Sequence, residues 1–334
     1  MHSGRGYSLL GVVAWTRREI LLFVLVAAIP NLLGLLGVVT PTVPWAPLAI
    51  VGTAVAFMTG FKGNTAYARL WEARQIWGGI VNASRSWAMF VQHYVALPEP
   101  EAELDAVRLR LVHRHLAWIT ALRYQLREPR AWETMHLPHN AEYRARTYTL
   151  PEAAMSIDAA LATRLDADEL ARVLSKKNRA THVIALQAAA LHAVADRGAL
   201  TEFRHSEMMQ ALSVLYEHQG RCERIKNFPY PRQYSTINRI FVWTFIALLP
   251  FGLAPEFREL GEIERWLAVP LGALVAWVFH TMDKIGSSSE NPFEGGPNDV
   301  PMTAMSRAIE IDLLEMFDAS DIPPAIAPIN DILM

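Results

Sequence analysis

Long apolar stretches alternate along the chain with charged, amphipathic ones, and the apolar stretches come in two pairs. The first pair is a run from Ile20 to Phe61 that contains no Asp, Glu, Lys, Arg or His. A helix needs about 20 apolar residues to cross a bilayer core of about 30 Å, so these 42 residues predict two crossings. The two prolines within Thr40–Pro44 interrupt a helix and predict the turn between the crossings.

The second pair lies near the C-terminus, at Ile240–Pro255 and Trp266–Met282, with His280 as the only ionisable residue in either stretch. Each is short for a full crossing, but flanking arginines can extend to the membrane surface and tryptophans favour the interface. We therefore predict four transmembrane helices. The first is longer than the roughly 7–15 apolar residues of a signal peptide, which favours an uncleaved span.

Basic residues flank the predicted spans on one side of the membrane. Arg17 and Lys62 border the first pair, and Arg239 and Lys284 border the second. Because basic flanks favour the cytoplasm, both termini and the long middle segment are predicted to be cytoplasmic. The expected location is the cell membrane, with several crossings and lipid around the spans.

The middle of the chain is typical of a water-soluble helical protein. Leu111, Trp118 and Leu122 fall close to one face of a helix, with arginines among them. Strand-like alternation is scarce and no Asn-Gly hairpin signal occurs, so the predicted fold class is all-α. The predicted organisation is an N-terminal segment with transmembrane helices 1 and 2 and a cytosolic extension (1–90), a cytosolic helical region (91–234), transmembrane helices 3 and 4 (235–285) and a cytosolic C-terminal segment (286–334).

Composition removes several classes of function. Hydrophobic residues make up 52% of the chain and charged residues 19%, and a net charge of −2 gives no basis for a nucleic-acid partner. The single cysteine, Cys222, excludes a disulfide framework within one chain. The phosphate-binding loop, the nucleophile elbow and the H-E-x-x-H zinc motif are all absent. We therefore predict no catalytic residues, no metal and no cofactor.

The second predicted span carries the most informative pattern. Thr53, Phe57 and Phe61 recur every four residues and share one helical stripe. If several copies of this helix surround an axis with the stripe inward, stacked Phe rings form an apolar constriction that gates ions by dewetting. The spacing leaves a second interpretation open, in which the stripe faces lipid or a neighbouring helix.

Two groups of motifs resemble a known family. Asn64–Arg74 reads Asn-x-x-Tyr-x-Arg-x-Trp-Glu-x-Arg, and Trp77–Arg85 reads Trp-Gly-x-x-Val-Asn-x-Ser-Arg. Far along the chain come Glu290–Phe293, Glu-Asn-Pro-Phe, and Asn298–Pro301, Asn-Asp-Val-Pro. With four spans in matching places, the chain resembles the bestrophin family, particularly its bacterial members, over nearly its whole length.

The resemblance implies a passive, homopentameric ion channel with four transmembrane helices per subunit and a pore along the fivefold axis. The family's narrow neck falls here on Thr53, Phe57 and Phe61. Thr53 is a departure, because the family commonly has a branched aliphatic residue there, and its hydroxyl would make that end of the neck wetter. The cytosolic aperture of the family, aligned without gaps back from Gly220, falls near Phe203.

The resemblance also raises the question of calcium. Animal bestrophins bind calcium through an acidic cluster after the Asn-Pro-Phe element, where this chain has only the separated carboxylates Glu294 and Asp299. Calcium takes about six to eight oxygen ligands. We therefore predict no calcium activation.

The sign of the permeant ion is not fixed by composition. Lys62 beside Phe61 and an outer loop without acids, residues 38–47, favour chloride or other anions among the small monovalent ions. A sodium channel of the same fold is one alternative, and a non-conducting membrane scaffold that docks a soluble cytosolic protein is another. A membrane enzyme with its site between Val91 and Arg232 is disfavoured because catalytic motifs are lacking.

Overall fold

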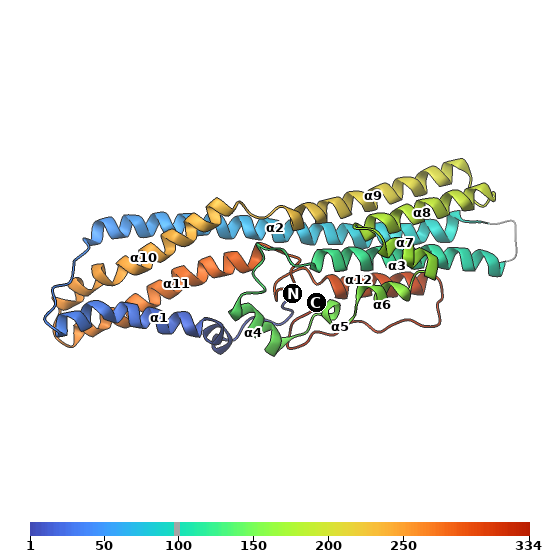
Figure 1. Cartoon of the computed structure of the whole chain (residues 1–334). Helices are drawn as coiled ribbons and strands as arrows, with labels where there is room; N and C mark the ends of the chain where they lie inside the picture. The colour runs from blue at the N-terminus through green and yellow to red at the C-terminus, as the bar shows by residue number, and fades with distance from the viewer. Residues whose placement is uncertain (97–100) are drawn as a thin grey trace. The chain divides into compact units, whose positions relative to one another are not determined.

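The computed structural model describes residues 1–96 and 101–334, and residues 97–100 of the predicted cytosolic region lie outside this description (Figure 1). The chain divides into two compact units. We call residues 4–69 and 229–290 the membrane unit, and residues 1–3, 70–228 and 291–334 the hydrophilic unit. Helices account for the regular structure of the described residues, which contain isolated β-bridges and no strand.

The membrane unit contains four long, apolar helices. They are α1 (Leu9–Leu35), the first half of α2 (Trp45–Tyr94), α10 (Arg232–Arg258) and α11 (Ala268–Ser289), the last preceded by the short 3₁₀ helix η1 (Glu264–Leu267) (Figure 1). All four are long and apolar enough to cross a membrane. The prediction of an all-α fold with four helices able to cross a membrane is therefore confirmed for the described residues.

Close approach of helices holds the membrane unit together. A Cβ atom on Gly52 would lie 2.9 Å from the ring of Phe245, and one on Gly272 would lie 3.4 Å from Ala27. Small residues at such positions allow backbones to pack closely in the membrane, where the hydrophobic effect between helices is weak. The helix α10 continues through two prolines, Pro250 and Pro255. It also extends beyond the predicted apolar stretch, Ile240–Pro255, at both ends.

The hydrophilic unit is a bundle of long helices with several short ones packed beside it. The long helices are the second half of α2, α3 (Glu101–Arg127), α8 (Arg179–Asp196), α9 (Glu202–Asn227) and α12 (Met302–Met316), and the short ones are α4 (Pro138–Thr147), α5 (Pro151–Ala154), α6 (Ile157–Ala162) and α7 (Ala167–Leu174). Helix α3 packs against α8, and α8 packs against α9. Asn178 caps α8, since its side-chain oxygen accepts a hydrogen bond from the Thr181 backbone N–H at 3.0 Å.

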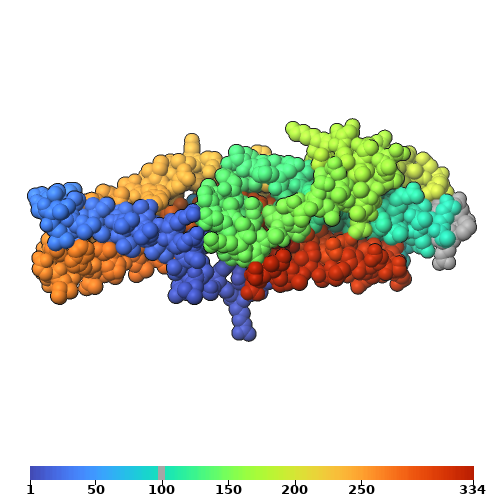
Figure 2. Space-filling model, turned by 60° about the horizontal axis from the view of Figure 1, so that its bottom comes forward, coloured from blue at the N-terminus to red at the C-terminus, as the bar shows by residue number. Residues whose placement is uncertain are grey.

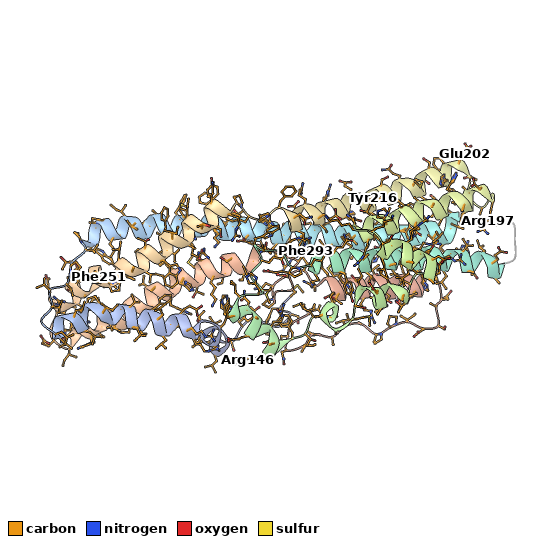
Figure 3. All side chains as sticks on the ribbon, in the orientation of Figure 1. Arg146, Arg197, Glu202, Tyr216, Phe251 and Phe293 are labelled. Atoms are coloured by element: carbon orange, nitrogen blue, oxygen red, sulfur yellow. The ribbon has the colours of Figure 1, made fainter. Side chains whose placement is uncertain are left out.

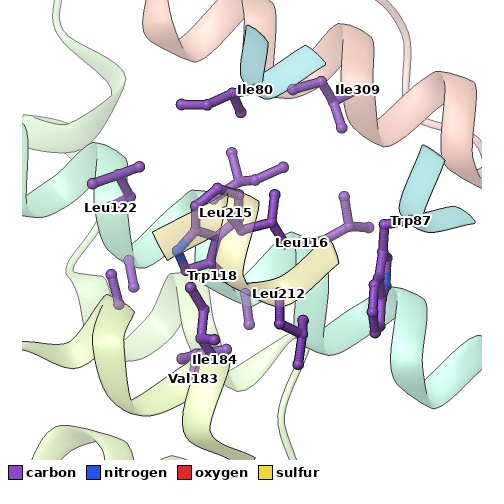
Figure 4. Packing of buried hydrophobic residues seen from close by; sticks show 14 of the residues in the cluster. Ile80, Trp87, Leu116, Trp118, Leu122, Val183, Ile184, Leu212, Leu215 and Ile309 are labelled. Carbon is purple, nitrogen blue, oxygen red and sulfur yellow. The ribbon is translucent and has the colours of Figure 1, made fainter. Parts of the chain in front are cut away.

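The long helices and the short helices α6 and α7 contribute to the core of the hydrophilic unit. Figure 4 shows Trp87 of α2, Trp118 of α3, Val183 of α8, Leu212 of α9 and Ile309 of α12 in one cluster. These side chains are fully buried or nearly so. The predicted face of α3 therefore does point into a core.

Two pairs of buried polar groups in this core are in hydrogen-bonding contact. The indole N–H of Trp118 donates to Gln219 Oε1 at 2.9 Å, and the ring of His115 contacts Ser84 Oγ at 2.9 Å. Burial lowers the pKa of His115 to about 3, so this histidine is neutral. Cys222 is also fully buried, and burial raises the pKa of its thiol, so it packs as a small apolar side chain rather than serving as a nucleophile.

The C-terminal segment is an integral part of the hydrophilic unit. Helix α12 packs on α3, and Figure 2 shows the segment, red, lying along the green helices of the same unit. Ile309 of α12 is buried in the core, whereas Ile322, beyond the end of α12, is exposed.

This contrast yields a matched pair of variants. Ile309→Ala should destabilise the protein by about 2–5 kcal/mol because it leaves a cavity in a packed core. Ile322→Ala removes the same atoms from an exposed site and should cost less than about 0.5 kcal/mol. Chemical or thermal unfolding of both variants in detergent measures the difference, and equal stabilities would contradict the packing described for α12.

Candidate functional site

The predicted neck residues lie on one uncovered face of α2. Phe57 is 68% exposed, Phe61 is 58% exposed, and Thr53 is exposed on the same stripe one turn earlier. The two Phe rings are 4.8 Å apart and inclined at 75°, an edge-to-face arrangement. Thr53 Oγ1 donates a hydrogen bond to the Ala49 carbonyl at 2.9 Å. The stripe is continuous and free of contacts that cover it within the described chain.

The opposite face of α2 is anchored by a buried ion pair. Lys62 Nζ donates to Asp283 Oδ1 of α11 at 2.7 Å and to Ser287 Oγ at 2.6 Å. The side chains of Lys62 and Asp283 are only 3% and 8% exposed. Asn238 of α10 donates to the same Asp283 oxygen at 2.7 Å and accepts a hydrogen bond from Thr59 at 3.3 Å. This polar network joins α2, α10 and α11.

The position of Lys62 corrects one argument drawn from the sequence. Although Lys62 follows Phe61 directly, its ammonium group is buried and paired with Asp283 rather than placed on the Phe stripe. Its charge therefore gives no reason to expect an anion preference. The expectation that Lys62 favours anions beside Phe61 was wrong, because adjacent residues on a helix point in directions about 100° apart.

A second polar cluster joins α1 and α11. Lys284 Nζ donates to Glu19 Oε1 at 2.8 Å and to the Trp15 carbonyl at 3.1 Å, and it lies over the Trp15 ring. The Nε2 atom of His280 is 3.9 Å from the Glu19 carboxylate. His280 was the only ionisable residue that the sequence placed inside a predicted span. The cluster was not predicted, because the helices extend beyond the apolar stretches. The sequence feature that could have indicated this cluster is the pair of charged residues, Asp283 and Lys284, directly after an apolar stretch.

The two sequence signatures meet at Glu290. Arg69, from the first signature, donates its Nε hydrogen to the Glu290 carbonyl at 2.9 Å. Arg232, at the start of α10, pairs with the Glu290 carboxylate at 2.8 Å. Glu290 itself is almost fully buried. Residues more than 200 positions apart thus fix the end of α11 to the end of the membrane-unit part of α2.

The rest of the second signature forms a compact, buried loop in the hydrophilic unit. Asp299 Oδ2 accepts hydrogen bonds from the backbone N–H groups of Gly295 and Gly296, both at 2.8 Å. Gly295 has a φ of +89°, a conformation that favours glycine. Arg127 donates to the carbonyl of Phe293, a buried residue that is labelled in Figure 3. The loop is therefore held by the Asp299 carboxylate and by Arg127 of α3.

The carboxylates of this loop are already engaged by donors from the protein. Glu294 accepts hydrogen bonds from the backbone N–H and the hydroxyl of Thr134 at 2.7 and 2.9 Å, and from the Met135 N–H at 3.2 Å. Among the described residues, no three His, Cys, Asp or Glu side chains come together in a group that could hold a metal ion. Independence from calcium remains a prediction.

The predicted aperture residue lies on the surface at the start of a helix. Phe203 is 72% exposed and is the second residue of α9, whose cap is the Thr201 hydroxyl. Figure 3 shows the neighbouring Glu202 at this end of α9, after Arg197 at the end of α8. The exposure leaves Phe203 free to contact other molecules, and its role in an aperture remains a prediction.

Comparison with known proteins identifies the family. A sequence profile described as Bacterial/Fungal Bestrophin protein matches residues 10–315, which include all four membrane helices and both signatures. The chain belongs to the bestrophin family. The sequence resemblance carried by the two signatures is thereby confirmed.

Named relatives and solved structures agree with this assignment. The voltage-dependent anion channel-forming protein YneE of Salmonella typhi is 30% identical over 83% of this chain and 78% of its own length. The protein of the same name from Escherichia coli K12 is 29% identical over 85% of this chain and 80% of its length. A crystal structure of a bacterial bestrophin homologue from Klebsiella pneumoniae covers 91% of this chain and 98% of its own at 24% identity, with a TM-score of 0.73, which shows the shared fold.

Removing one partner of the buried ion pair should be costly. Lys62→Met leaves the Asp283 carboxylate buried without its cation, and should destabilise the protein by about 3–5 kcal/mol. The double variant with Asp283→Leu removes both charges and should recover much of that loss. Unfolding in detergent of the single and double variants measures the coupling.

A surface pair provides the control for this experiment. Arg85 and Asp312 form an ion pair with half-exposed side chains, so Arg85→Gln should cost less than about 1 kcal/mol. If Lys62→Met is as mild as Arg85→Gln, the buried pair does not anchor α2.

The loop after Phe293 should make stability depend on pH. Burial raises the pKa of Glu294 from 4.5 to about 8, and the Asp299 carboxylate adds to the rise. Between these two pH values the folded state holds a proton that the unfolded chain has released. The stability that this group contributes is therefore fully present below pH 4.5 and is lost as the pH rises toward 8, by at most about 1.4 kcal/mol per pH unit.

The variant Glu294→Gln keeps a neutral side chain of the same shape and should flatten this dependence. Melting temperatures at pH 5.5, 6.5 and 7.5 measure it, with the exposed Glu103→Gln as a control that keeps the slope of the unmodified protein. Some slope should remain, because burial also raises the pKa of Asp299. An unchanged slope in Glu294→Gln would show that Glu294 is ionised throughout.

Proposed function

We propose that the chain forms a passive anion channel, with chloride as the representative ion, in which several copies surround a pore lined by Thr53, Phe57 and Phe61. The observation that carries this proposal is the uncovered Phe stripe on the face of α2 opposite the buried Lys62–Asp283 pair. Relatives named as voltage-dependent anion channel-forming proteins support the sign of the ion.

The apolar stripe suits a hydrophobic gate. Rings of Phe57 and Phe61 from several subunits would leave a narrow passage that excludes water when closed, and a small increase in radius would let ions through. Thr53, one turn toward the outer end, adds a hydroxyl to that passage. Phe203 would provide a second constriction at the cytosolic end.

The proposed assembly is a homopentamer in the cell membrane. Each subunit crosses the membrane four times, with both termini, residues 91–234 and residues 286–334 on the cytoplasmic side and lipid around the four spans. Basic residues at the cytoplasmic ends of the spans support this orientation. Residues 1–3 and 291–334 belong to the same hydrophilic unit, as expected if both termini lie on one side of the membrane.

The alternatives are less well supported. A sodium channel of the same fold would be expected to concentrate cations, whereas residues 38–47, the outer loop, contain no acid and the relatives carry names of anion channels. A scaffold without a pore would leave the Phe stripe without a role. Membership of a channel family argues against the enzyme.

Recordings from purified protein in planar bilayers test the proposal. In asymmetric NaCl the reversal potential should lie close to the equilibrium potential of chloride. Replacing Phe57 and Phe61 together with Ala should raise the conductance severalfold or abolish closure, because the apolar constriction widens. Phe241→Ala, which alters an exposed aromatic residue of α10, should leave the currents unchanged and is the matched control.

Three results would contradict the proposal in different ways. A reversal potential near that of sodium would overturn the anion assignment alone. Unchanged currents in the double Phe variant would move the pore away from this stripe. An image of the assembled particle with Phe57 and Phe61 against lipid and no axial hole would overturn the channel itself.

A further inference from the structure

Three arginines line a small cavity in the hydrophilic unit. The cavity has a volume of about 70 Å³ and lies between α3, the turn after α6, α12 and the C-terminal tail. Figure 1 shows α3, α6 and α12 close together in this unit, and α3 packs against both of the others. Arg123, Arg164 and Arg307 contribute guanidinium groups to its lining, and Thr120 and Ser306 contribute hydroxyls.

Carboxylates nearby are shared among these cations. Glu310 pairs with both Arg164 and Arg307, the latter at 3.0 Å. The Glu152 carboxylate lies 3.2 Å from Arg123 Nε and 3.6 Å from Arg127 Nε. The Asp321 carboxylate attracts the Arg164 guanidinium. Glu310 and Glu152 thus each serve two guanidinium groups.

Some N–H groups at this cavity and next to it lack a hydrogen bond. The Nε hydrogen of Arg123 is buried and makes no hydrogen bond, although its nitrogen lies 3.2 Å from Glu152 Oε1. The Nε and one terminal nitrogen of the neighbouring Arg127, which is not in the lining, are also without a hydrogen bond. Each guanidinium has five N–H donors, and an unsatisfied buried donor is costly. Burial lowers the pKa of Arg123, and the neighbouring Arg127 and Arg307 lower it further against the opposing effect of Glu152. An anion in the cavity would relieve both the missing acceptors and the repulsion.

The hydroxyl groups narrow the choice of anion. Thr120 donates its proton to the Leu116 carbonyl at 2.8 Å, and Ser306 donates its proton to the Met302 carbonyl at 2.7 Å. Their oxygens remain able to accept a hydrogen bond. A ligand that carries both acceptor oxygens and an O–H group therefore satisfies this lining better than one with acceptors alone.

We propose that this cavity is a binding site for inorganic phosphate in its hydrogen-bearing form. The planar forks of Arg123, Arg164 and Arg307 match the oxygens of a tetrahedral oxyanion, and the P–OH group donates to the hydroxyl oxygen of Thr120 or Ser306. Sulfate has the same shape but no O–H group, so it binds more weakly. The volume is far below the roughly 300–1,000 Å³ of ordinary ligand pockets, which excludes nucleotides.

The site also involves the C-terminal tail. Ile326 contributes to the lining, and Arg307 Nη1 donates to the Pro324 carbonyl at 3.3 Å. Bound phosphate would therefore hold α3, α12 and the tail together. The site lies outside the proposed pore lining and does not depend on conduction.

Calorimetric titration of the full chain in detergent with sodium phosphate, at constant ionic strength and pH 7, tests the proposal. We expect one phosphate per subunit and weaker binding of sulfate. Arg307→Gln should weaken phosphate binding about tenfold, because a charge-assisted hydrogen bond is lost. Arg221→Gln, which alters an exposed arginine paired with Glu217, is the matched control and should bind as the unmodified protein does.

A second variant separates binding from folding. Glu310→Gln removes the carboxylate that competes for Arg164 and Arg307, so it should bind phosphate severalfold more tightly, a gain that a folding defect does not produce. No binding by the folded unmodified protein, or equal binding by Arg307→Gln, would overturn the site. Sulfate binding as tight as that of phosphate would overturn the assignment to phosphate.

Discussion

The buried pairing of Lys62 with Asp283 is the constraint on which the arrangement of α2 depends. Taking two opposite charges out of water costs several kcal/mol per ion, and that cost is offset only when the ions meet and their remaining hydrogen-bonding groups are satisfied. Ser287 and Asn238 provide those further bonds. The pair therefore fixes the rotation of α2 about its own axis. With 3.6 residues per turn, burying Thr59 and Lys62 turns Phe57 and Phe61 outward.

The two units are stabilised by different physics. In the hydrophilic unit, large side chains such as Trp87 and Trp118 fill a core that water would otherwise surround, and burial of apolar area is the main favourable term. In the membrane unit, apolar area counts for little because lipid is equally apolar. Small residues such as Gly52 permit close packing there, and buried polar pairs supply directional contacts.

Much of the fold follows from patterns that are local in the sequence. Runs without charge predict the spans, and the spacing of Leu111, Trp118 and Leu122 predicts the buried face of α3. Patterns of this kind do not show which residues meet across the chain. The contact of Arg69 with Glu290 joins positions 221 apart, and only the folded helices bring them together.

The candidate site, too, could be predicted from the sequence only in part. The stripe of Thr53, Phe57 and Phe61 could be predicted, because a period of four along one helix is a local pattern. The anchor behind it could not, since the pairing of Lys62 with Asp283 depends on how α2 and α11 pack. The boundaries of α10 and α11 were also underestimated, because polar residues at helix ends were counted as loop. Those same residues form the polar networks.

The edge-to-face arrangement of Phe57 and Phe61 bears on how an uncharged neck could favour anions. Thr53 has donated its hydroxyl proton to its own helix, so it offers lone pairs rather than a donor and does not solvate an anion. Aromatic rings carry a negative face and a positive edge, and two rings inclined at 75° can both turn an edge toward one axis. In the proposed pore, rings held edge-on would present their positive edges to the passing ion. Selectivity for anions would thus arise from ring orientation, and it would need no basic residue in the neck.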